Sequence, residues 1–142
     1  DGTIQALCRS KHEKIVQTFS KDQGKTWSPL ERTELPNNNS GIEALTLQDG
    51  RHLLLYNHMG GGRRSEGWGK RNILHLAISE DGQRWEATAI VEQADAGEFS
   101  YPSMIQTRDG LVHMTYTWNR KRVKHVVVNP ADLISQPIAV FD

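Results

Sequence analysis

The sequence has few of the features that mark several large classes of protein. It contains one cysteine, Cys8, which excludes an internal disulfide bond and leaves the cellular compartment open. Acidic and basic residues balance at 17 each, so the charge gives no indication of a nucleic-acid partner or an anionic membrane. No apolar run approaches the roughly 18 residues of a membrane-spanning helix, so we expect no membrane span.

Helical periodicity is also weak throughout the chain, which favours an all-β fold. The histidines lack the spacing of zinc ligands, and we expect structural roles for four that lie in or beside alternating strand segments: His52, His75, His113 and His125. We therefore predict no metal and no cofactor. The chain lacks an initiator methionine and opens on Asp-Gly, which predicts that it is cut from a longer protein.

The clearest motif that is present is the turn segment Ser20–Trp27. Asp22 can accept hydrogen bonds from backbone N–H groups of its own turn, and Gly24 permits a positive φ. We expect the large side chain of Trp27 to pack the returning strand against its neighbours. A shorter variant without the threonine follows at Ser79–Trp85. Two copies of one turn predict a repeated unit.

A second repeated signal is the dipeptide Asp-Gly, which opens apolar-rich segments at Asp1, Asp49 and Asp109. Asp-Gly between two strand-like runs is a strong hairpin signal. Each of these strands is followed by a loop and a further strand, at residues 14–19, 72–78 and 122–128. A Ser-x-Asp turn comes next, in degenerate form at Asn129 in the third copy. The unit is therefore a four-stranded antiparallel meander.

Three such units predict three blades of a β-propeller, with approximate limits at residues 1–40, 41–97 and 98–142. The interval from Asp1 to Asp49 is near the roughly 40–50 residues of a propeller blade, and the next interval is lengthened by the insertion Gly60–Lys70. Closed propellers have about 4–8 blades. We therefore expect missing N-terminal blades or a second chain to close the ring.

The meander predicts which residues share one end of the propeller. Asp-Gly and Ser-x-Asp turns fall at one end, and polar and aromatic residues gather at the other: Arg9, Asn39, Ser40, Asn57, His58, Arg71, Tyr101, Trp118, Arg120 and Arg122. Guanidinium groups bind carboxylates in bidentate fashion and stay charged at any working pH. These residues predict a pocket for a carboxylated ligand, and they do not by themselves name a reaction.

Each of these residues also has a structural interpretation. Arg9 and Arg71 could be solvated or paired with local carboxylates, and Tyr101 could pack between blades. His58 could be an ordinary surface histidine. Trp118, and Trp68 in the insertion, could stack on a sugar face or belong to the fold. In the same insertion, the basic cluster Arg63, Arg64 and Lys70 is more typical of a solvated loop than of a phosphate site.

The ordered combination of motifs resembles the sialidase superfamily, in its BNR-repeat, predicted-neuraminidase branch. Ser20–Trp27 matches the Asp-box of that superfamily, and Ser79–Trp85 is a degenerate copy. The segments Pro36–Glu43, Glu98–Ser103 and Thr115–Trp118 are similar to the same branch. The resemblance covers essentially the whole chain, and it implies the second half of a six-bladed, sialidase-like β-propeller.

The resemblance implies an exo-glycosidase that acts on a terminal carboxylated sugar, with sialic acid as the first candidate. Sialidases place three arginines on the substrate carboxylate and use a tyrosine nucleophile, a paired glutamate and an aspartate acid/base. Arg9 and Arg71 fall where the second and third arginines are expected, and Tyr101 falls where the nucleophile is expected. The remaining groups would lie upstream, so we expect the fragment alone to be inactive; Glu43 and Glu98 are nearby acids without an assigned role.

Two other functions remain open at this stage. Asp-boxes also occur in propellers that are not enzymes, so the chain could belong to a non-catalytic carbohydrate-binding propeller. It could also belong to a protein-interaction propeller, in which case changing Arg9 or Arg71 would leave function intact. An arginine, an aspartate and a glutamate upstream at propeller spacing would favour the hydrolase.

Overall fold

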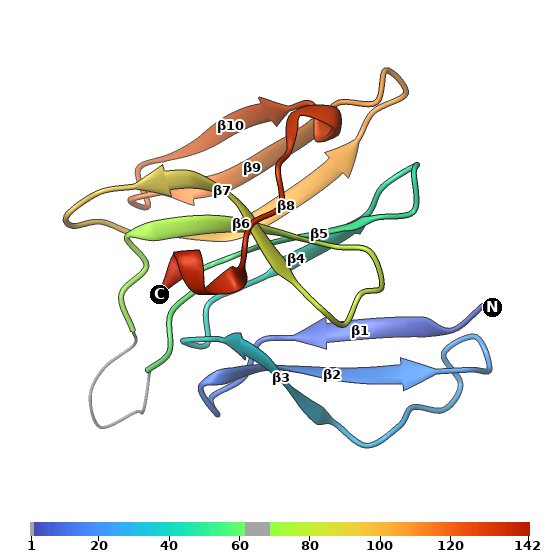
Figure 1. Ribbon diagram of the computed structural model, residues 1–142. Coiled ribbons are helices and arrows are strands. Elements are labelled where there is room, and N and C mark those ends of the chain that lie inside the picture. The colour runs from blue at the N-terminus through green and yellow to red at the C-terminus, as the bar shows by residue number, and fades with distance from the viewer. Residues whose placement is uncertain (1, 62–68) are drawn as a thin grey trace.

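The computed structural model describes residues 2–61 and 69–142, which form antiparallel β-sheets (Figure 1). The first sheet has the order β1 (Ile4–Cys8), β2 (Lys14–Ser20), β3 (Glu31–Pro36). The second has the order β4 (Glu43–Thr46), β5 (His52–Tyr56), β6 (Ile73–Ser79), β7 (Glu86–Gln93). The third contains β8 (Phe99–Gln106), β9 (Val112–Trp118) and β10 (Arg122–Val128). The all-β prediction is confirmed, and the strands predicted at 14–19, 72–78 and 122–128 are β2, β6 and β10.

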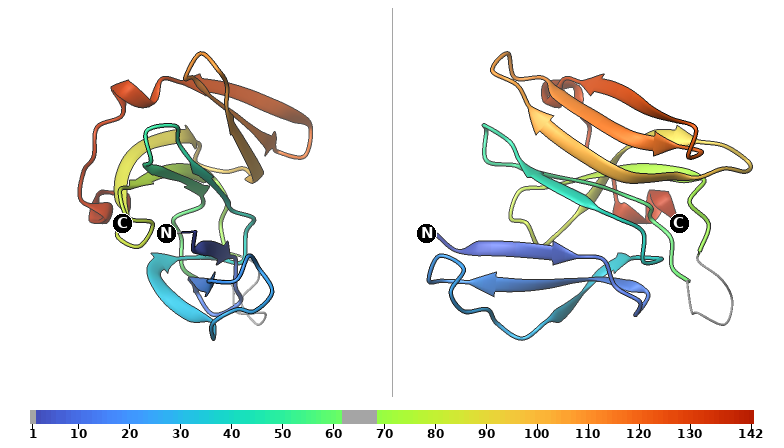
Figure 2. Two further views of the ribbon diagram at one scale, coloured as in Figure 1. Left: turned by 90° about the vertical axis from the view of Figure 1, so that its right-hand side faces the viewer. Right: turned by 180° about the vertical axis from the view of Figure 1, so that it is seen from behind.

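The three sheets are stacked in chain order, with the β4–β7 sheet in the middle (Figures 1 and 2). Successive side chains of a strand point to opposite faces, so a strand buried on both faces is apolar at every position. Leu53 and Leu55 pack into the core shared with the third sheet. Leu54 and Tyr56 pack into a second core, which is shared with the first sheet. The described sheets form an open stack and do not close a ring.

The Asp-Gly turns behave as predicted at the two hairpins that the structure describes. Gly50 and Gly110 have φ angles of 91° and 85°, which favour glycine. The Asp49 Oδ1 atom accepts a hydrogen bond from the backbone N–H of Arg51 at 3.0 Å. The Asp109 Oδ1 atom accepts one from the backbone N–H of Leu111 at 3.2 Å. The side chain thus satisfies a donor of its own turn in both cases.

The Ser-x-Asp turn Ser20–Trp27 is closed by its own side chains. Asp22 Oδ1 accepts from the backbone N–H of Thr26 at 2.8 Å, and Ser20 Oγ accepts from that of Gly24 at 2.8 Å. Trp85, in the second copy of the turn, is buried as expected. The expectation for Trp27 is wrong, because 45% of its surface is exposed and its indole N–H bonds to the Gly24 carbonyl oxygen within the turn.

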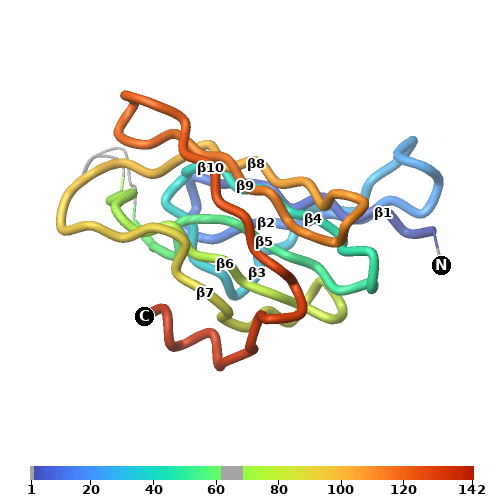
Figure 3. Tube along the Cα trace, turned by 90° about the horizontal axis from the view of Figure 1, so that it is seen from above, coloured from blue at the N-terminus to red at the C-terminus, as the bar shows by residue number. Residues whose placement is uncertain are grey.

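The third unit lacks the fourth strand that the repeat predicts. After β10 the chain forms two short 3₁₀ helices, η1 (Pro130–Asp132) and η2 (Ile138–Phe141). Between them Gln136 pairs with Ala87 of β7 through two backbone hydrogen bonds of 2.8 and 2.9 Å. Figure 3 follows this red segment from β10 past β7 to the C-terminus. Ile138 and Phe141 pack against the second core, so burial of apolar surface draws the segment away from β10.

Part of the insertion in the middle unit cannot be compared with the sequence-based interpretations. Arg63, Arg64 and Trp68 lie outside the described residues. The flanking residues Gly61 and Gly69 are described, and the chain re-enters the middle sheet through Arg71 and Asn72.

Candidate functional site

Arg71 is held by backbone contacts between the second and third sheets. It precedes β6 and forms an isolated parallel bridge with Glu98, which precedes β8. The Arg71 carbonyl oxygen accepts a hydrogen bond from the backbone N–H of Phe99 at 2.7 Å. Tyr101 lies two residues beyond Phe99, so its Cα atom is at most about 7 Å further along the chain. The structure therefore brings Arg71 and Tyr101 to one region.

The polar loop between β3 and β4 supports the segment that leads to Arg71. Asn38 Nδ2 donates to the Lys70 carbonyl oxygen at 2.7 Å, and Asn38 Oδ1 accepts from the backbone N–H of Ser40 at 3.1 Å. A Cβ atom added to Gly69 would lie 2.7 Å from the Asn38 Cβ atom. The two segments can approach this closely only because residue 69 is glycine.

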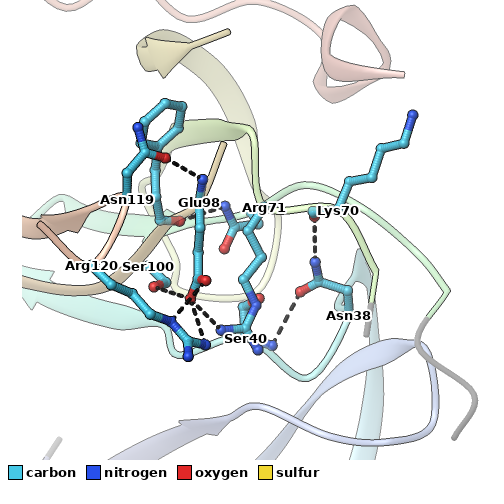
Figure 4. A network of polar contacts seen from close by, with 10 residues as sticks. Asn38, Ser40, Lys70, Arg71, Glu98, Ser100, Asn119 and Arg120 are labelled. Carbon is cyan, nitrogen blue, oxygen red and sulfur yellow. Dashed lines mark hydrogen bonds and ion pairs between the residues drawn. The ribbon is translucent and has the colours of Figure 1, made fainter. Parts of the chain in front are cut away.

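Glu98 joins Arg71 to the hairpin between β9 and β10 (Figure 4). Its Oε1 atom lies 3.2 Å from Arg71 Nη1, and its Oε2 atom lies 2.9 Å from Arg120 Nε. A second contact, from Arg120 Nη2 to Oε1 at 3.2 Å, makes the Arg120 pair bidentate. Ser100 Oγ also donates to Oε1, at 3.1 Å. The side chains bring two guanidinium groups to a single carboxylate.

The protonation state of Glu98 follows from these contacts. Burial raises the pKa of its carboxyl group. Hydrogen bonds from Arg120 and Ser100, together with the charges of Arg120 and Arg71, outweigh burial and hold the pKa below its ordinary value. Glu98 is therefore ionised at neutral pH, and the cluster of two arginines and one glutamate carries one net positive charge.

The backbone around Glu98 is fixed by the β9–β10 turn. Asn119 Oδ1 accepts from the backbone N–H of Glu98 at 2.7 Å, and the backbone N–H of Asn119 donates to the Glu98 carbonyl oxygen at 2.7 Å. Gly97 has a φ of 145°, and a Cβ atom there would lie 2.8 Å from Asn119 Oδ1. Asn119 and Arg120 themselves have φ angles of 52° and 53°. A strained turn thus delivers Arg120 to Glu98.

Tyr101 occupies an irregular position in β8. The register with β9 shifts between Ser100 and Ser103, and the φ of Tyr101 is 52°. A non-glycine residue at such a φ costs about 1–3 kcal/mol and is common at functional sites. Tyr101 is 58% exposed, and the atoms nearest to the Cβ position of Gly41 are its Cα and Cδ1, each at 3.6 Å. The strain turns a large aromatic side chain outward beside the β3–β4 loop.

Asn57 and Ser40 lie buried in the same region. Asn57 Nδ2 donates to the carbonyl oxygens of Ile73 and Phe99, at 2.7 and 3.0 Å. Asn57 Oδ1 and Ser40 Oγ are buried and have no hydrogen-bond partner among the described residues. Unpartnered buried polar atoms are uncommon, and they frequently mark a place where water or a ligand binds.

Three other predicted site residues have different surroundings. Arg9 is exposed, and no hydrogen bond or ion pair joins its side chain to another residue in the described part of the chain. The Cζ atom of Arg122 lies 4.2 Å from the centroid of the Trp118 ring. The same ring is tilted against that of Phe99, with the two ring centroids 6.4 Å apart. Asn39 has a φ of 64°, and its backbone N–H donates to Asn37 Oδ1 at 2.9 Å.

His58 belongs to a buried cluster under η2. Its Nδ1 atom lies 2.5 Å from the Tyr56 hydroxyl oxygen, and its Nε2 atom lies 3.2 Å from Asp142 Oδ1. Its backbone N–H donates to His75 Nδ1 at 3.1 Å. Burial lowers the pKa of His75 to about 4, and it also lowers that of His58 against the opposing effect of Asp142. Both imidazoles are neutral at pH 7, and both ring nitrogens of His58 have partners within the protein.

The sequence reasoning placed Arg120 and Glu98 near the pocket but missed that they pair with each other. It gave no role to Asn38, Gly69, Gly97 or Asn119, which hold the arginine–glutamate cluster in place. The residue type of Asn119 was a possible signal, because asparagine tolerates the left-handed region better than most residues, and the structure places Asn119 there with a φ of 52°. The close approaches of Gly69 and Gly97 depend on segments far apart in the chain, and no local pattern predicts them.

A separate cleft of about 1000 Å³ lies between the first two sheets, near the Asp-box turns. It is lined by residues that include Gln5, Phe19, Asp81 and Trp85. None of the predicted site residues lines it. Within residues 2–61 and 69–142, no group of three or more His, Cys, Asp or Glu side chains could hold a metal ion. No described helix is long and apolar enough to cross a membrane.

This architecture is that of the BNR-repeat proteins, and the chain belongs to that family: the BNR repeat-like domain matches residues 1–114. The resemblance drawn from the Asp-boxes is therefore confirmed. No curated protein matches the chain.

Similar solved structures include three enzymes of sialic acid chemistry. The intramolecular trans-sialidase from Ruminococcus gnavus has a TM-score of 0.73 and 20% identity, over 96% of this chain and 32% of that one. The leech intramolecular trans-sialidase has a TM-score of 0.71 and 16% identity, over 94% and 22%. The NanB sialidase from Streptococcus pneumoniae has a TM-score of 0.67 and 15% identity, over 94% and 22%. The fold is thus sialidase-like, and the chain spans a third or less of the length of these enzymes.

Proposed function

We propose that this chain is the second half of a six-bladed sialidase-like propeller that hydrolyses a terminal carboxylated sugar, sialic acid or a related compound. Its blades would correspond to residues 1–40, 41–97 and 98–142. The observation that carries the proposal is the hydrogen bond between the Phe99 N–H and the Arg71 carbonyl oxygen, because it holds a guanidinium-bearing segment next to the strand of Tyr101. The fold shared with trans-sialidases and NanB supports the same class of substrate.

In this mechanism Arg71, with Arg9 and an upstream arginine, binds the sugar carboxylate. Tyr101 Oη attacks the anomeric carbon, the bond to the aglycone breaks, and an upstream acid protonates the departing oxygen. A glutamate accepts the phenolic proton, and water then releases the sugar from the tyrosine. A neutral phenol suits this substrate because a carboxylate nucleophile would be repelled by the substrate's own negative charge. Ser40, Asn57, His58, Asn39 and Trp118 complete the proposed substrate-binding set.

The test uses the full-length protein that contains this chain. We would measure aglycone release from aryl sialosides and uronides by the unaltered protein and by Tyr101→Phe and Arg71→Ala. We expect Tyr101→Phe to abolish turnover and Arg71→Ala to raise KM for acidic sugars. Tyr116→Phe is the control, because Tyr116 is buried in the core and its hydroxyl group donates to Glu92 at 2.9 Å, away from the proposed site. Turnover that survives Tyr101→Phe would remove the tyrosine from its role.

A carbohydrate-binding propeller without catalysis is the second candidate. In the described part of the chain no carboxylate is hydrogen-bonded to the Tyr101 hydroxyl group, so the hydrolase requires a glutamate from upstream residues, whereas the binding propeller requires none. If no glycoside is turned over but acidic sugars still bind in an Arg71-dependent manner, the binding function replaces the hydrolase.

A further inference from the structure

Arg71 and Arg120 share the Glu98 carboxylate unequally. Arg71 contacts it through one nitrogen, Nη1, at 3.2 Å. Arg120 contacts both carboxylate oxygens, through Nε at 2.9 Å and Nη2 at 3.2 Å (Figure 4). Bidentate pairs are the stronger and more directional of the two arrangements. The glutamate is therefore committed mainly to Arg120.

The arginine that makes the weaker contact with Glu98 is the less exposed of the two. The Arg71 side chain is 13% exposed and that of Arg120 is 72% exposed. A guanidinium has five N–H donors, and only the Nη1 contact to Glu98 engages those of Arg71 among the described residues. The more sheltered arginine thus keeps unused donors, although the carboxylate that could take them lies within contact distance.

The backbone would let Glu98 pair fully with Arg71 if Arg120 were absent. The two residues are bridge partners, and the adjoining N–H of Phe99 is bonded to the Arg71 carbonyl oxygen at 2.7 Å. Ser100 holds only one oxygen of the carboxylate. An ion pair of 1:1 stoichiometry would then neutralise Arg71 and occupy the face that binds a ligand carboxylate.

We propose that Arg120 is a positioning residue that draws Glu98 away from a bidentate pair with Arg71 and so leaves Arg71 available to the carboxylate of a sugar. The inference rests on the proposed function, since it assumes that Arg71 binds that carboxylate. Arg120 also supplies the excess positive charge of the cluster, which favours an anionic ligand over a neutral one. Its place on the exposed β9–β10 turn means that its removal disturbs no core packing.

The experiment compares the full-length protein with Arg120→Gln, Glu98→Gln and the double variant. Binding of N-acetylneuraminic acid, glucuronic acid and their methyl esters is measured by calorimetry, and KM and kcat are measured on any substrate that is turned over. We expect Arg120→Gln to weaken binding of the preferred acid by about tenfold, because Arg71, once paired with Glu98, loses one charge-assisted contact with the ligand carboxylate. Binding of its methyl ester should change little, and the change in turnover should fall on KM rather than on kcat.

The double variant separates this role from direct contact with the ligand. If Glu98 captures Arg71 when Arg120 is lost, removing the glutamate charge should restore binding to within about threefold of the unaltered protein. A double variant as weak as Arg120→Gln alone would overturn the inference, because it would mean that Arg120 itself holds the ligand. Arg108→Gln, on an exposed arginine of the β8–β9 turn, is the matched control for lost positive charge.

Arg71→Ala distinguishes failure of the inference from failure of the proposed function. If Arg71→Ala weakens binding and Arg120→Gln does not, the inference is overturned and the proposed function stands. If the unaltered protein binds neither acid in preference to its methyl ester, or if Arg71→Ala has no effect, both are overturned.

Discussion

The Asn38 side chain supports the segment that carries Arg71, because its Nδ2 atom donates a hydrogen bond to the Lys70 carbonyl oxygen at 2.7 Å. Asn38 is fully buried and lies on the loop that follows the first sheet, whereas Lys70 leads into the second. The position of the candidate site therefore depends on contacts between sheets as well as on the strands themselves.

Replacing Gly69 by alanine should displace this segment. The new Cβ atom would lie 2.7 Å from Asn38 Cβ, so one of the two chains must move and the 2.7 Å hydrogen bond is lost. We expect the free energy of unfolding to fall by about 1–3 kcal/mol and KM for an acidic substrate to rise. Denaturant titration and steady-state kinetics measure the two effects. Gly60→Ala is the control, because nothing lies within 4 Å of its Cβ position. Equal effects at both glycines would contradict the supporting role of Asn38.

A second glycine governs the Glu98 backbone. Alanine at Gly97 would place a Cβ atom 2.8 Å from Asn119 Oδ1 and would strain a backbone with a φ of 145°. We expect a loss of about 2 kcal/mol or more in unfolding free energy, since steric strain adds to a broken hydrogen bond. Thermal unfolding checks this, and an unchanged midpoint would show that the turn relaxes freely.

The first Asp-box should contribute to acid sensitivity. Hydrogen bonds from the side chain and backbone of Thr26, and from Ser20, lower the pKa of Asp22 from 3.8 to about 2. A carboxyl group whose pKa is lowered in the folded state stabilises the fold at pH values above its ordinary, unfolded-state pKa. That stabilisation is lost as the pH falls through the folded-state pKa. Asp22→Ala should therefore lower the unfolding temperature at pH 7 and flatten its decline below pH 4, as followed by circular dichroism. Asp95→Ala, at an exposed aspartate, serves as the comparison.

The buried histidines should make the protein less stable at mildly acidic pH. Burial, with a contribution from His58, lowers the pKa of His75 from 6.5 to about 4. Between about pH 6.5 and pH 4, His75 binds a proton in the unfolded chain but not in the folded one. The free energy of unfolding therefore keeps its full value above about pH 6.5 and falls as the pH drops toward 4. The loss amounts to about 3 kcal/mol at most.

Replacement of His75 tests this linkage. His75→Gln removes the titrating group, and the slope of unfolding free energy against pH should decrease between pH 6.5 and 4. His12→Gln, at an exposed histidine, is the comparison variant. If the His75 variant keeps the slope of the unaltered protein, another group is responsible.

Local patterns predicted the strands and turns well, because both are encoded over a few residues. The short apolar runs of β5 and β6, and the Asp-Gly turns at Asp49 and Asp109, are recognisable without any knowledge of distant contacts. The same local signals placed Arg71 and Tyr101 at one end of neighbouring units, and the structure brings their segments together.

What the sequence could not show depends on packing between distant segments. The fourth strand of the third unit was predicted by analogy with the other repeats, but η2 instead packs on the second core. The pairing of Glu98 with Arg120 requires the positive φ angles of the β9–β10 turn. His58 was predicted to lie beside the ligand, but the sequence could not show that Tyr56 and Asp142 engage both of its ring nitrogens.

The pairing of Gln136 with Ala87 has a consequence for how molecules of this protein meet one another. β7 is the outer strand of its sheet, and an uncovered outer strand offers unpaired N–H and C=O groups to any passing chain. The crossing segment occupies both backbone groups of Ala87 and lays η2 alongside the strand. The segment therefore protects the part of β7 around Ala87 from intermolecular strand addition. We expect its loss to cause aggregation in concentrated solution.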